Sequence, residues 1–293
     1  MHGRIETRHL SKLLSKAFAR PVNDIRVIPV GGGSINSTYQ LQSSAGAFFL
    51  KVNNGLDAEA MFKAEIGGLD LLRIKSSFTI PHVKTMFSDG QATYLLMDYI
   101  KSANRSNKYW QELAIKLAEL HKHTQNKFGL VNDNFIGSLP QHNAYENDWH
   151  SFFVNQRIMP MVKLAFDKKI IAKGFIADIE AVLNNITDLM PEEPPALVHG
   201  DLWSGNIMVD SQGNACLVDP AVYYGHREMD LAFSHLFGGF SQLFYHTYQE
   251  VYPMQPDFNK RIAIYNLYPL LVHLNLFGKS YLGDVEQIIA RFI

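Results

Sequence analysis

Three oxygen-bearing side chains with close spacing mark the most informative stretch of the sequence. Asp201 and Asn206 lie in the segment HGDLWSGN, residues 199–206, and Asp219 follows a short apolar run and a turn. Phosphoryl transfer needs a carboxylate that orients the attacking hydroxyl and accepts its proton, together with oxygen ligands for Mg²⁺ beside the phosphates. Asp201, Asn206 and Asp219 supply that set of groups.

The spacing distinguishes this set from ordinary loop residues. An Asp beside Gly or Pro, taken alone, is more often a turn or cap residue. Here the pattern Asp-x-x-x-x-Asn equals that of the protein-kinase catalytic loop H-R-D-x-x-x-x-N, with Gly200 in place of Arg, and Asp219 corresponds to the metal-binding Asp of D-F-G. We expect His199 to anchor backbone through a hydrogen bond rather than to move protons.

A glycine run near the N-terminus could contact phosphates. The segment GGGSIN, residues 31–36, lies between two expected strands, where a loop can offer backbone N–H groups to a nucleotide. A plain hairpin is the alternative interpretation. No helix pattern follows the run and the Walker A lysine is missing, so neither a Rossmann nor a P-loop site fits. The residues expected to bind phosphates here are Gly31, Gly32, Gly33, Ser34 and Asn36.

Lys51 is an isolated charge at the end of the apolar strand FFLKV, residues 48–52. Such a lysine either caps a sheet edge or holds a phosphate. Glu65 lies on the inward face of the next expected helix, where its carboxylate could pair with Lys51 and aim the ammonium group at the α- and β-phosphates. Glu59 lies about 120° away around that helix, so Glu65 is the favoured partner.

Two regions of different pattern must position these residues. Turn signals and short apolar runs predict strands over 25–30, 38–41, 48–52, 83–87 and 92–97, with a helix over about 57–74. Beyond residue 98 the spacing predicts helices over 148–167, 168–190, 240–252 and 258–277, and a hairpin of strands 207–209 and 215–218. Asp98, Tyr99 and Ile100 lie where the last strand of the first region ends. Their backbone would bind an adenine ring, or the segment would only join the two regions.

Composition restricts the class of protein. The chain has 293 residues, a net charge of -1 and 47% apolar residues, which disfavours disorder and nucleic acid as a partner. Cys216 is the only cysteine, so an internal disulfide is excluded and a reducing compartment, the cytoplasm by default, is expected. We expect Cys216 to be buried, and we expect neither a signal peptide nor a membrane segment from the sequence.

These segments together resemble the fructosamine kinase (ketosamine-3-kinase) family nearly end to end. The resemblance is carried by GGGSIN at 31–36, FFLKVN at 48–53, HGDLWSGN at 199–206 and DPAVYYGHRE at 219–228. Aminoglycoside phosphotransferases and choline kinases belong to the same kinase-like group. They share the residues that correspond to Asp201, Asn206 and Asp219. The context of Trp203 and the continuation Tyr-Gly-His-Arg-Glu are more similar to ketosamine kinases.

The resemblance implies an α+β, bilobal protein-kinase-like fold. Residues 1–100 would form a small antiparallel-sheet lobe with one inserted helix, and residues 101–293 a larger, mostly helical lobe. It also implies ATP- and Mg²⁺-dependent phosphorylation of the sugar 3-hydroxyl of ketosamines in the repair of glycated amines. By position, Asp201 would be the catalytic base, Asn206 and Asp219 the Mg²⁺ ligands, and Glu65 the residue that orients the phosphate-binding Lys51.

Other positions are less strongly assigned. Trp203, Tyr224 and His226 flank the catalytic segments and are candidates for the acceptor pocket, although aromatic residues at this density usually pack in a core. Asp230 resembles the Asp that braces the catalytic loop. Some members of the family carry a redox-active cysteine directly after the glycines, and here that position is Ser34.

Two other functions remain open at this stage. One is a small-molecule kinase of the same fold that acts on an aminoglycoside or a choline-like hydroxyl. The other is a pseudokinase that binds nucleotide without turnover, which is disfavoured because no expected catalytic residue is missing. The acceptor could be a fructose-, ribulose- or erythrulose-derived ketosamine, free or on a protein lysine, and the oligomeric state is open.

Overall fold

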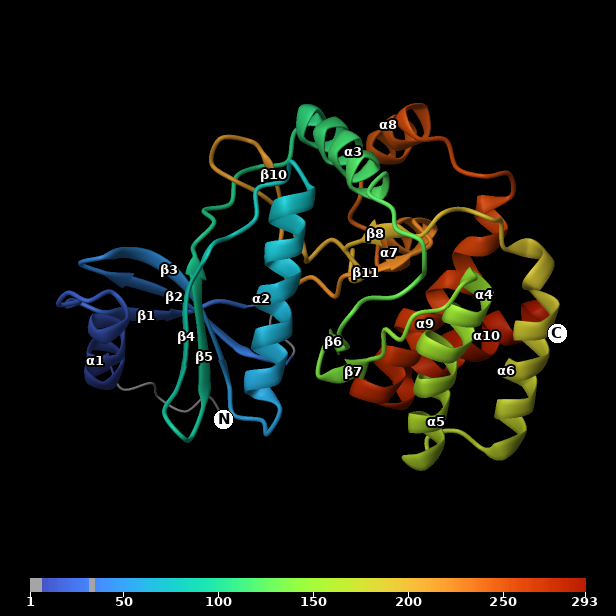
Figure 1. Cartoon of the computed structure of the whole chain (residues 1–293), viewed down its shortest axis with the longest axis horizontal. Helices are drawn as coiled ribbons and strands as arrows, with labels where there is room; N and C mark the ends of the chain where they lie inside the picture. The colour runs from blue at the N-terminus through green and yellow to red at the C-terminus, as the bar shows by residue number, and fades with distance from the viewer. Residues whose placement is uncertain (1–6, 32–34) are drawn as a thin grey trace.

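The computed structural model describes residues 7–31 and 35–293, and its N-terminal part is a five-stranded antiparallel sheet (Figure 1). The order of the strands is β1-β2-β3-β5-β4. Their bounds are β1 Arg26–Pro29, β2 Ser37–Ser43, β3 Gly46–Asn53, β4 Val83–Ser88 and β5 Thr93–Asp98. All five expected strands are therefore present, and β3 is central, which places Lys51 opposite Thr38 on one side and Leu95 on the other.

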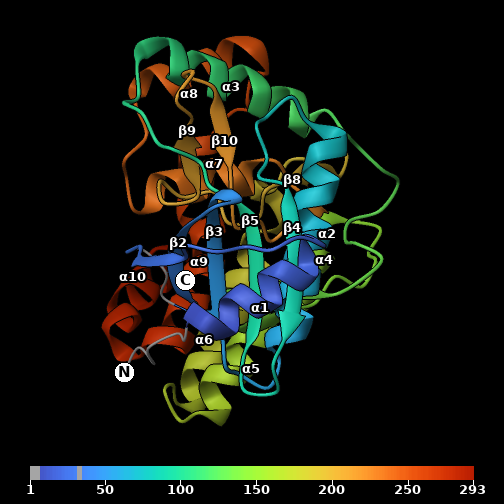
Figure 2. The same cartoon turned by 90° about the vertical axis from the view of Figure 1, so that its left-hand side faces the viewer.

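One helix covers each face of this sheet. Helix α1 (Thr7–Ala17) crosses the outer face, as Figure 2 shows, and its Leu10 and Leu14 pack into a core with Leu41 and Leu50. Helix α2 (Ala58–Lys75) lies on the other face, between the sheet and the rest of the chain (Figure 1). The expected inserted helix is thus confirmed, and it faces the interior of the molecule.

The remainder of the described chain is mostly helical. The helices are α3 Asn107–His121, α4 Trp149–Phe152, α5 Met159–Asp167, α6 Lys173–Asn185, α7 Glu228–Leu236, α8 Gln242–Val251, α9 Phe258–Phe277 and α10 Leu282–Phe292. A π-helical segment, Phe153–Ile158, joins α4 to α5, and short 3₁₀ turns lie at Thr187–Leu189 and Lys279–Tyr281. Nothing in the described part of the chain is a helix both long and apolar enough to cross a membrane.

Three small antiparallel pairs of strands interrupt the helices. They are β6 (Asn134–Ile136) with β7 (Leu139–Gln141), β8 (Ala196–Val198) with β11 (Tyr223–Gly225), and β9 (Ile207–Val209) with β10 (Ala215–Leu217). The hairpin β9–β10 was expected and is confirmed, with Cys216 buried in it. The other two pairs were not predicted. Strands β8 and β11 are far apart in the sequence, and the two-residue turn Gly137–Ser138 between β6 and β7 was missed.

Some predicted helix bounds are wrong. A helix over 168–190 was expected, but residues 168–172 form a turn and α6 ends at Asn185. The helix expected over 148–167 contains the π-helical segment. In contrast, α9 matches the expected range 258–277 even though Pro269 lies inside it, since nearly every side chain of its central turns is buried and packing holds the helix.

Backbone contacts join the two parts of the molecule next to the catalytic segment. Thr79, which follows α2, donates its N–H to the Ala215 carbonyl at 3.1 Å, and Leu217 donates to the Thr79 carbonyl at 3.2 Å. The hairpin β9–β10 is therefore tied directly to the loop that carries α2 back to the sheet. This connection fixes the position of Asp219, which lies just after β10, relative to the N-terminal sheet.

Candidate active site

The catalytic loop begins after β8 and is held by one buried carboxylate. Asp230, in the first turn of α7, accepts backbone N–H groups from His199 at 2.7 Å and from Gly200 at 2.9 Å, and it also contacts the His121 ring. Gly200 has a φ of +82°, and a Cβ there would lie 2.1 Å from the Ala221 carbonyl oxygen. Glycine is thus required where protein kinases have Arg, and Asp230 braces the loop as expected.

His199 is a structural member of this loop. Its side chain is fully buried, and its Nε2 lies 3.1 Å from the Val218 carbonyl, while Nδ1 accepts the Asp201 backbone N–H at 3.3 Å. Because Nδ1 accepts, the proton is on Nε2 and is donated to Val218. Burial lowers the pKa of His199, so the ring stays neutral and anchors backbone, in agreement with the sequence-based expectation.

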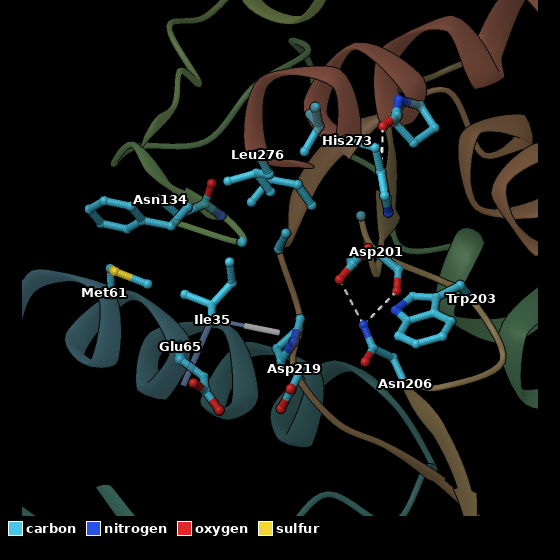
Figure 3. A pocket seen from close by; sticks show the side chains of 18 of the residues that line it. Ile35, Met61, Glu65, Asn134, Asp201, Trp203, Asn206, Asp219, His273 and Leu276 are labelled. Carbon is cyan, nitrogen blue, oxygen red and sulfur yellow. Dashed lines mark hydrogen bonds between the residues drawn. The ribbon is translucent and has the colours of Figure 1, made fainter. Parts of the chain in front are cut away.

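Asp201 and Asn206 form a direct pair within the loop (Figure 3). The Asn206 side-chain amide donates to the Asp201 carboxylate at 2.7 Å and to the Asp201 carbonyl at 2.9 Å. Burial raises the pKa of Asp201 to about 7, against the opposing effect of the Asn206 hydrogen bond and with a smaller contribution from the charge of Asp219. A carboxylate with a pKa near neutrality is suited to accept a proton from a hydroxyl.

Lys51 links the N-terminal sheet to the second aspartate. Its ammonium group lies 2.7 Å from a Glu65 oxygen and 2.5 Å from Asp219 Oδ1, and the lysine is only 2% exposed. Although burial opposes the charge, the two carboxylates keep the Lys51 pKa above its usual value. Glu59 instead pairs with Lys63 on the exposed face of α2. The structure thus brings Lys51 and Glu65 together, as the helical spacing indicated.

The oxygens of Asn206 and Asp219 fit a magnesium ion. The Asn206 amide nitrogen is occupied by Asp201, so its Oδ1 points away from Asp201, to the side on which Asp219 lies in Figure 3. Asp219 has a φ of +54°, and its side chain is 47% exposed. One carboxylate and one amide oxygen, completed by water and phosphate oxygens, is the donor set that Mg²⁺ accepts beside a nucleotide.

The other expected nucleotide contacts are only partly described. Gly32, Gly33 and Ser34 lie outside the described residues; Gly31 is exposed, and Asn36 accepts a hydrogen bond from Asn53 at 2.8 Å. In the connector, Asp98 pairs with Lys84 at 2.6 Å, and Tyr99 and Ile100 are half-buried. The assignment of Gly31 and of residues 98–100 to nucleotide binding stays a prediction.

A cavity of about 480 Å³ joins these residues. Lys51 and Glu65 line it from the N-terminal sheet and α2, and Asp201, Asn206 and Asp219 line it from the catalytic segment. Asn36 also contributes to the wall. The residues predicted as base and metal ligands, together with Lys51, Glu65 and Asn36, therefore face one common space between the sheet and the helical part of the molecule.

Of the three acceptor candidates, only Trp203 lines this cavity. His226 is fully buried between other rings, with its centroid 5.6 Å from that of Tyr265 and 5.9 Å from that of Trp149, and burial lowers its pKa to about 4. Tyr224 lies on β11 opposite Leu197 and packs in the core. For Tyr224 and His226 the acceptor prediction is corrected: aromatic core packing is the reason for their position.

Sequence reasoning missed part of the cavity wall. Phe237 follows α7, His273 and Phe277 lie near the end of α9, and Tyr281 follows α9, and all four line the cavity. In Figure 3 His273 projects from its helix toward Asp201. The one available signal was that His273 is, with Asn275, one of two strongly polar residues in the mostly apolar stretch 267–278.

Comparisons with known proteins show the family of this chain. The family model described as "Fructosamine kinase" matches residues 6–293. A protein of Enterococcus faecium named "Probable ketoamine kinase" is 38% identical over 91% of this chain and 95% of its own length. The chloroplastic protein-ribulosamine 3-kinase of Arabidopsis thaliana is 38% identical over 90% of this chain and 81% of its own length.

Solved structures show the same fold. The crystal structure of a protein of Haemophilus somnus assigned as a fructosamine-3-kinase has a TM-score of 0.87 at 27% identity and covers 97% of this chain and 96% of that one. An aminoglycoside phosphotransferase has a TM-score of 0.63 at 16% identity over 97% of this chain and 99% of its own, which shows a shared kinase-like fold and no more. This chain belongs to the fructosamine kinase family, whose members are ATP-dependent phosphotransferases.

Proposed function

We propose that this protein transfers the γ-phosphoryl group of ATP to the 3-hydroxyl of a ketosamine sugar. The observation that carries the proposal is that Asp201, Asn206, Asp219, Lys51 and Glu65 all line one cavity. The relatives named as ketoamine and protein-ribulosamine kinases supply the substrate class. The acceptor would be free or attached to a protein lysine, and the reaction would serve the repair of glycated amines.

Asp201 would act as the base. Its carboxylate faces the cavity beside Trp203, and the Asn206 amide fixes its orientation at 2.7 Å. The acceptor hydroxyl would donate its hydrogen bond to Asp201 and lose the proton to it as the bond to phosphorus forms. Because the pKa of Asp201 is raised to about 7, the group is basic enough for this transfer and still largely ionised above neutrality.

The remaining charged residues would position the phosphates. Lys51, held by Glu65 at 2.7 Å, would neutralise nucleotide oxygens, and Asn206 and Asp219 would hold the metal. ATP supplies the phosphoryl group, and Mg²⁺ neutralises the charge that develops on it. Lys51 donates to Glu65 and Asp219 and, because an ammonium group has three N–H donors, one remains for a phosphate oxygen.

The charges in the cavity favour a ketosamine over an aminoglycoside. Among the described residues that line it, the carboxylates are Glu65, Asp201 and Asp219, and two of these are paired with Lys51. An aminoglycoside carries several ammonium groups, and its recognition requires further acidic partners. A ketosamine carries one ammonium group and several hydroxyls, which the described wall matches better.

A panel of acceptors tests the proposal. ADP release would be measured with fructosamines, ribulosamines, aminoglycosides and choline, using the wild-type chain and Asp201→Asn. We expect turnover with at least one ketosamine and a loss of about 100-fold or more in the variant. Turnover with choline or an aminoglycoside alone would overturn the substrate class, and nucleotide binding without any turnover would indicate a pseudokinase.

A further inference from the structure

Five aromatic rings form a continuous wall on one side of the cavity. This aromatic wall consists of Trp203, Phe237, His273, Phe277 and Tyr281, and all five residues line the cavity. The centroid of His273 is 4.9 Å from that of Phe237, 5.4 Å from that of Phe277 and 5.1 Å from that of Tyr281. Trp203, two residues after the proposed base, meets Phe237 edge-on at 6.4 Å.

The wall is open to solvent at its outer end. Phe237 is 42% exposed and Phe277 is 44% exposed, while Trp203, His273 and Tyr281 are partly buried. Single exposed apolar side chains are common, but Phe237 and Phe277 both contact the His273 ring, and exposed apolar side chains gathered in one patch mark ligand or partner sites. The wall thus extends from the neighbourhood of Asp201 to the surface, which is the path that a substituent on the acceptor would follow.

The chemistry of the wall suits an organic cation. Aromatic faces attract ammonium groups. The carboxylates of the described cavity lining are Glu65, Asp201 and Asp219, so a cation at the aromatic wall would be held by the rings themselves. His273 donates from Nδ1 to the Pro269 carbonyl at 2.7 Å, which leaves Nε2 as an acceptor, and in Figure 3 this edge of the ring faces the cavity. Burial lowers the pKa of His273, so no positive charge on the ring opposes a bound cation.

We propose that the aromatic wall is a subsite for the amine part of the acceptor, and that it selects ketosamines whose secondary ammonium group carries an apolar or aromatic substituent. The inference rests on the proposed function, because the amine nitrogen of a ketosamine is on C1, two carbons from the reacting C3. With the 3-hydroxyl at Asp201, the ammonium group would lie between Trp203 and His273. Its substituent would lie against Phe237, Phe277 and Tyr281.

Steady-state kinetics with matched acceptors tests the subsite. Two fructosamines would be compared, one with a benzyl group on the amine and one with an unsubstituted amine, using Phe277→Ala and the control Phe166→Ala. Phe166 is similarly exposed, at 41%, but lies on α5 and does not line the cavity. We expect Phe277→Ala to raise KM for the benzyl compound by about 3- to 30-fold, with little change for the unsubstituted one and none in KM for ATP.

Equal changes in KM for both fructosamines, or the same change in Phe166→Ala, would overturn the subsite while leaving the proposed function intact.

If the wild-type chain phosphorylates no ketosamine, the proposed function fails, and calorimetry still tests the subsite. The probes are then the N-benzylmethylammonium ion and neutral N-benzylacetamide. Tighter binding of the cation, weakened in Phe277→Ala, supports the subsite. Absent binding, or equal affinity of the wild type and the variant, overturns it.

Discussion

Asp201 combines a catalytic role with a cost to stability at high pH. Its folded-state pKa of about 7 exceeds its ordinary value of 3.8, so between these values the folded chain binds more protons than the unfolded chain, and stability falls as pH rises. We therefore predict that Asp201→Asn raises the melting temperature of the ligand-free protein at pH 8, and has a much smaller effect near pH 4. Calorimetry at both pH values is the measurement, and an equal effect at both would contradict the raised pKa.

Lys51 and Glu65 should act as one unit in catalysis. Lys51→Met should lower turnover by about 100-fold or more, and Glu65→Gln by less, because the lysine keeps its charge and loses only one partner. The double variant should be no worse than Lys51→Met. Glu59→Gln is the matched control, since Glu59 pairs with Lys63 on the same helix and should leave turnover unchanged.

Additive losses in the double variant would remove Glu65 from the site. The melting temperature of each variant must be measured alongside, because Lys51→Met leaves Glu65 and Asp219 without their cationic partner. A loss of turnover that merely follows a loss of folded protein would count against the catalytic role of the pair.

At the scale of single residues, the sequence predicted the polar centre well and the acceptor side poorly. Asp201, Asn206 and Asp219 are close in sequence, and the helical period of 3.6 distinguishes Glu65 from Glu59. Tyr224 and His226 were misplaced because all of β11 and the residue that follows it are buried, so the aromatic residues after the motif pack in the core and not at the cavity.

At the scale of elements, α2 is positioned by close contact with the segment after Asp219. A Cβ on Gly68 would lie 3.1 Å from Pro220 Cγ, whereas a Cβ on Gly67 would meet nothing within 4 Å. Gly68 thus allows α2 to approach the catalytic segment and hold Glu65 against Lys51. Glycine lowers helix stability, so the close contact with Pro220 is the physical reason for a glycine at position 68.

Substitution of the two glycines separates contact from helix propensity. Gly67→Ala should stabilise the protein by about 0.5–1 kcal/mol without changing turnover, because alanine favours the helix. Gly68→Ala should lower turnover by about 3- to 10-fold, because displacement of α2 moves Glu65. Chemical denaturation and ADP release are the measurements. Identical behaviour of the two variants would show that the Pro220 contact does not position α2.

Elements with a clear period were predictable, and those defined by tertiary contact were not. The five strands of the sheet alternate with turn signals, and apolar residues recur along the whole of α9, so both were expected. The pair β6–β7 is a local hairpin across the two-residue turn Gly137–Ser138. The pair β8–β11 exists because backbone groups from distant segments meet, as when Tyr223 pairs with Val198. No local pattern in the sequence encodes such a pairing.

At the scale of the whole molecule, the site depends on residues from both of its parts. Lys51 comes from the sheet, and Asn206 and Asp219 come from the catalytic segment. We predict that ATP with Mg²⁺ raises the melting temperature of the whole chain, and that Asp219→Asn removes most of the part that depends on Mg²⁺. Thermal melts with nucleotide, with and without Mg²⁺, measure this. An unchanged Mg²⁺ dependence in the variant would exclude Asp219 as a ligand.

The two-part architecture was predictable because the sequence pattern changes clearly from strands to helices near residue 98, and because the family motifs are spread from residue 31 to residue 228. The acceptor side of the cavity was not, since its aromatic wall is assembled from the ends of α7 and α9 and from the catalytic loop. Each of these aromatic residues looks like core in the sequence. Only the arrangement of the helices shows that they share one surface.

The position of the phosphate on the product tests the account most directly. A ketosamine would be incubated with ATP, Mg²⁺ and the wild-type chain, and the phosphorylated carbon would be assigned by phosphorus–proton correlation NMR. We predict phosphate on the oxygen of C3, and an initial rate of product formation lower by about 100-fold or more with Asp201→Asn at the same protein concentration. Phosphate on another carbon, or equal product from the variant, would contradict the assignment of Asp201 as the base for the 3-hydroxyl.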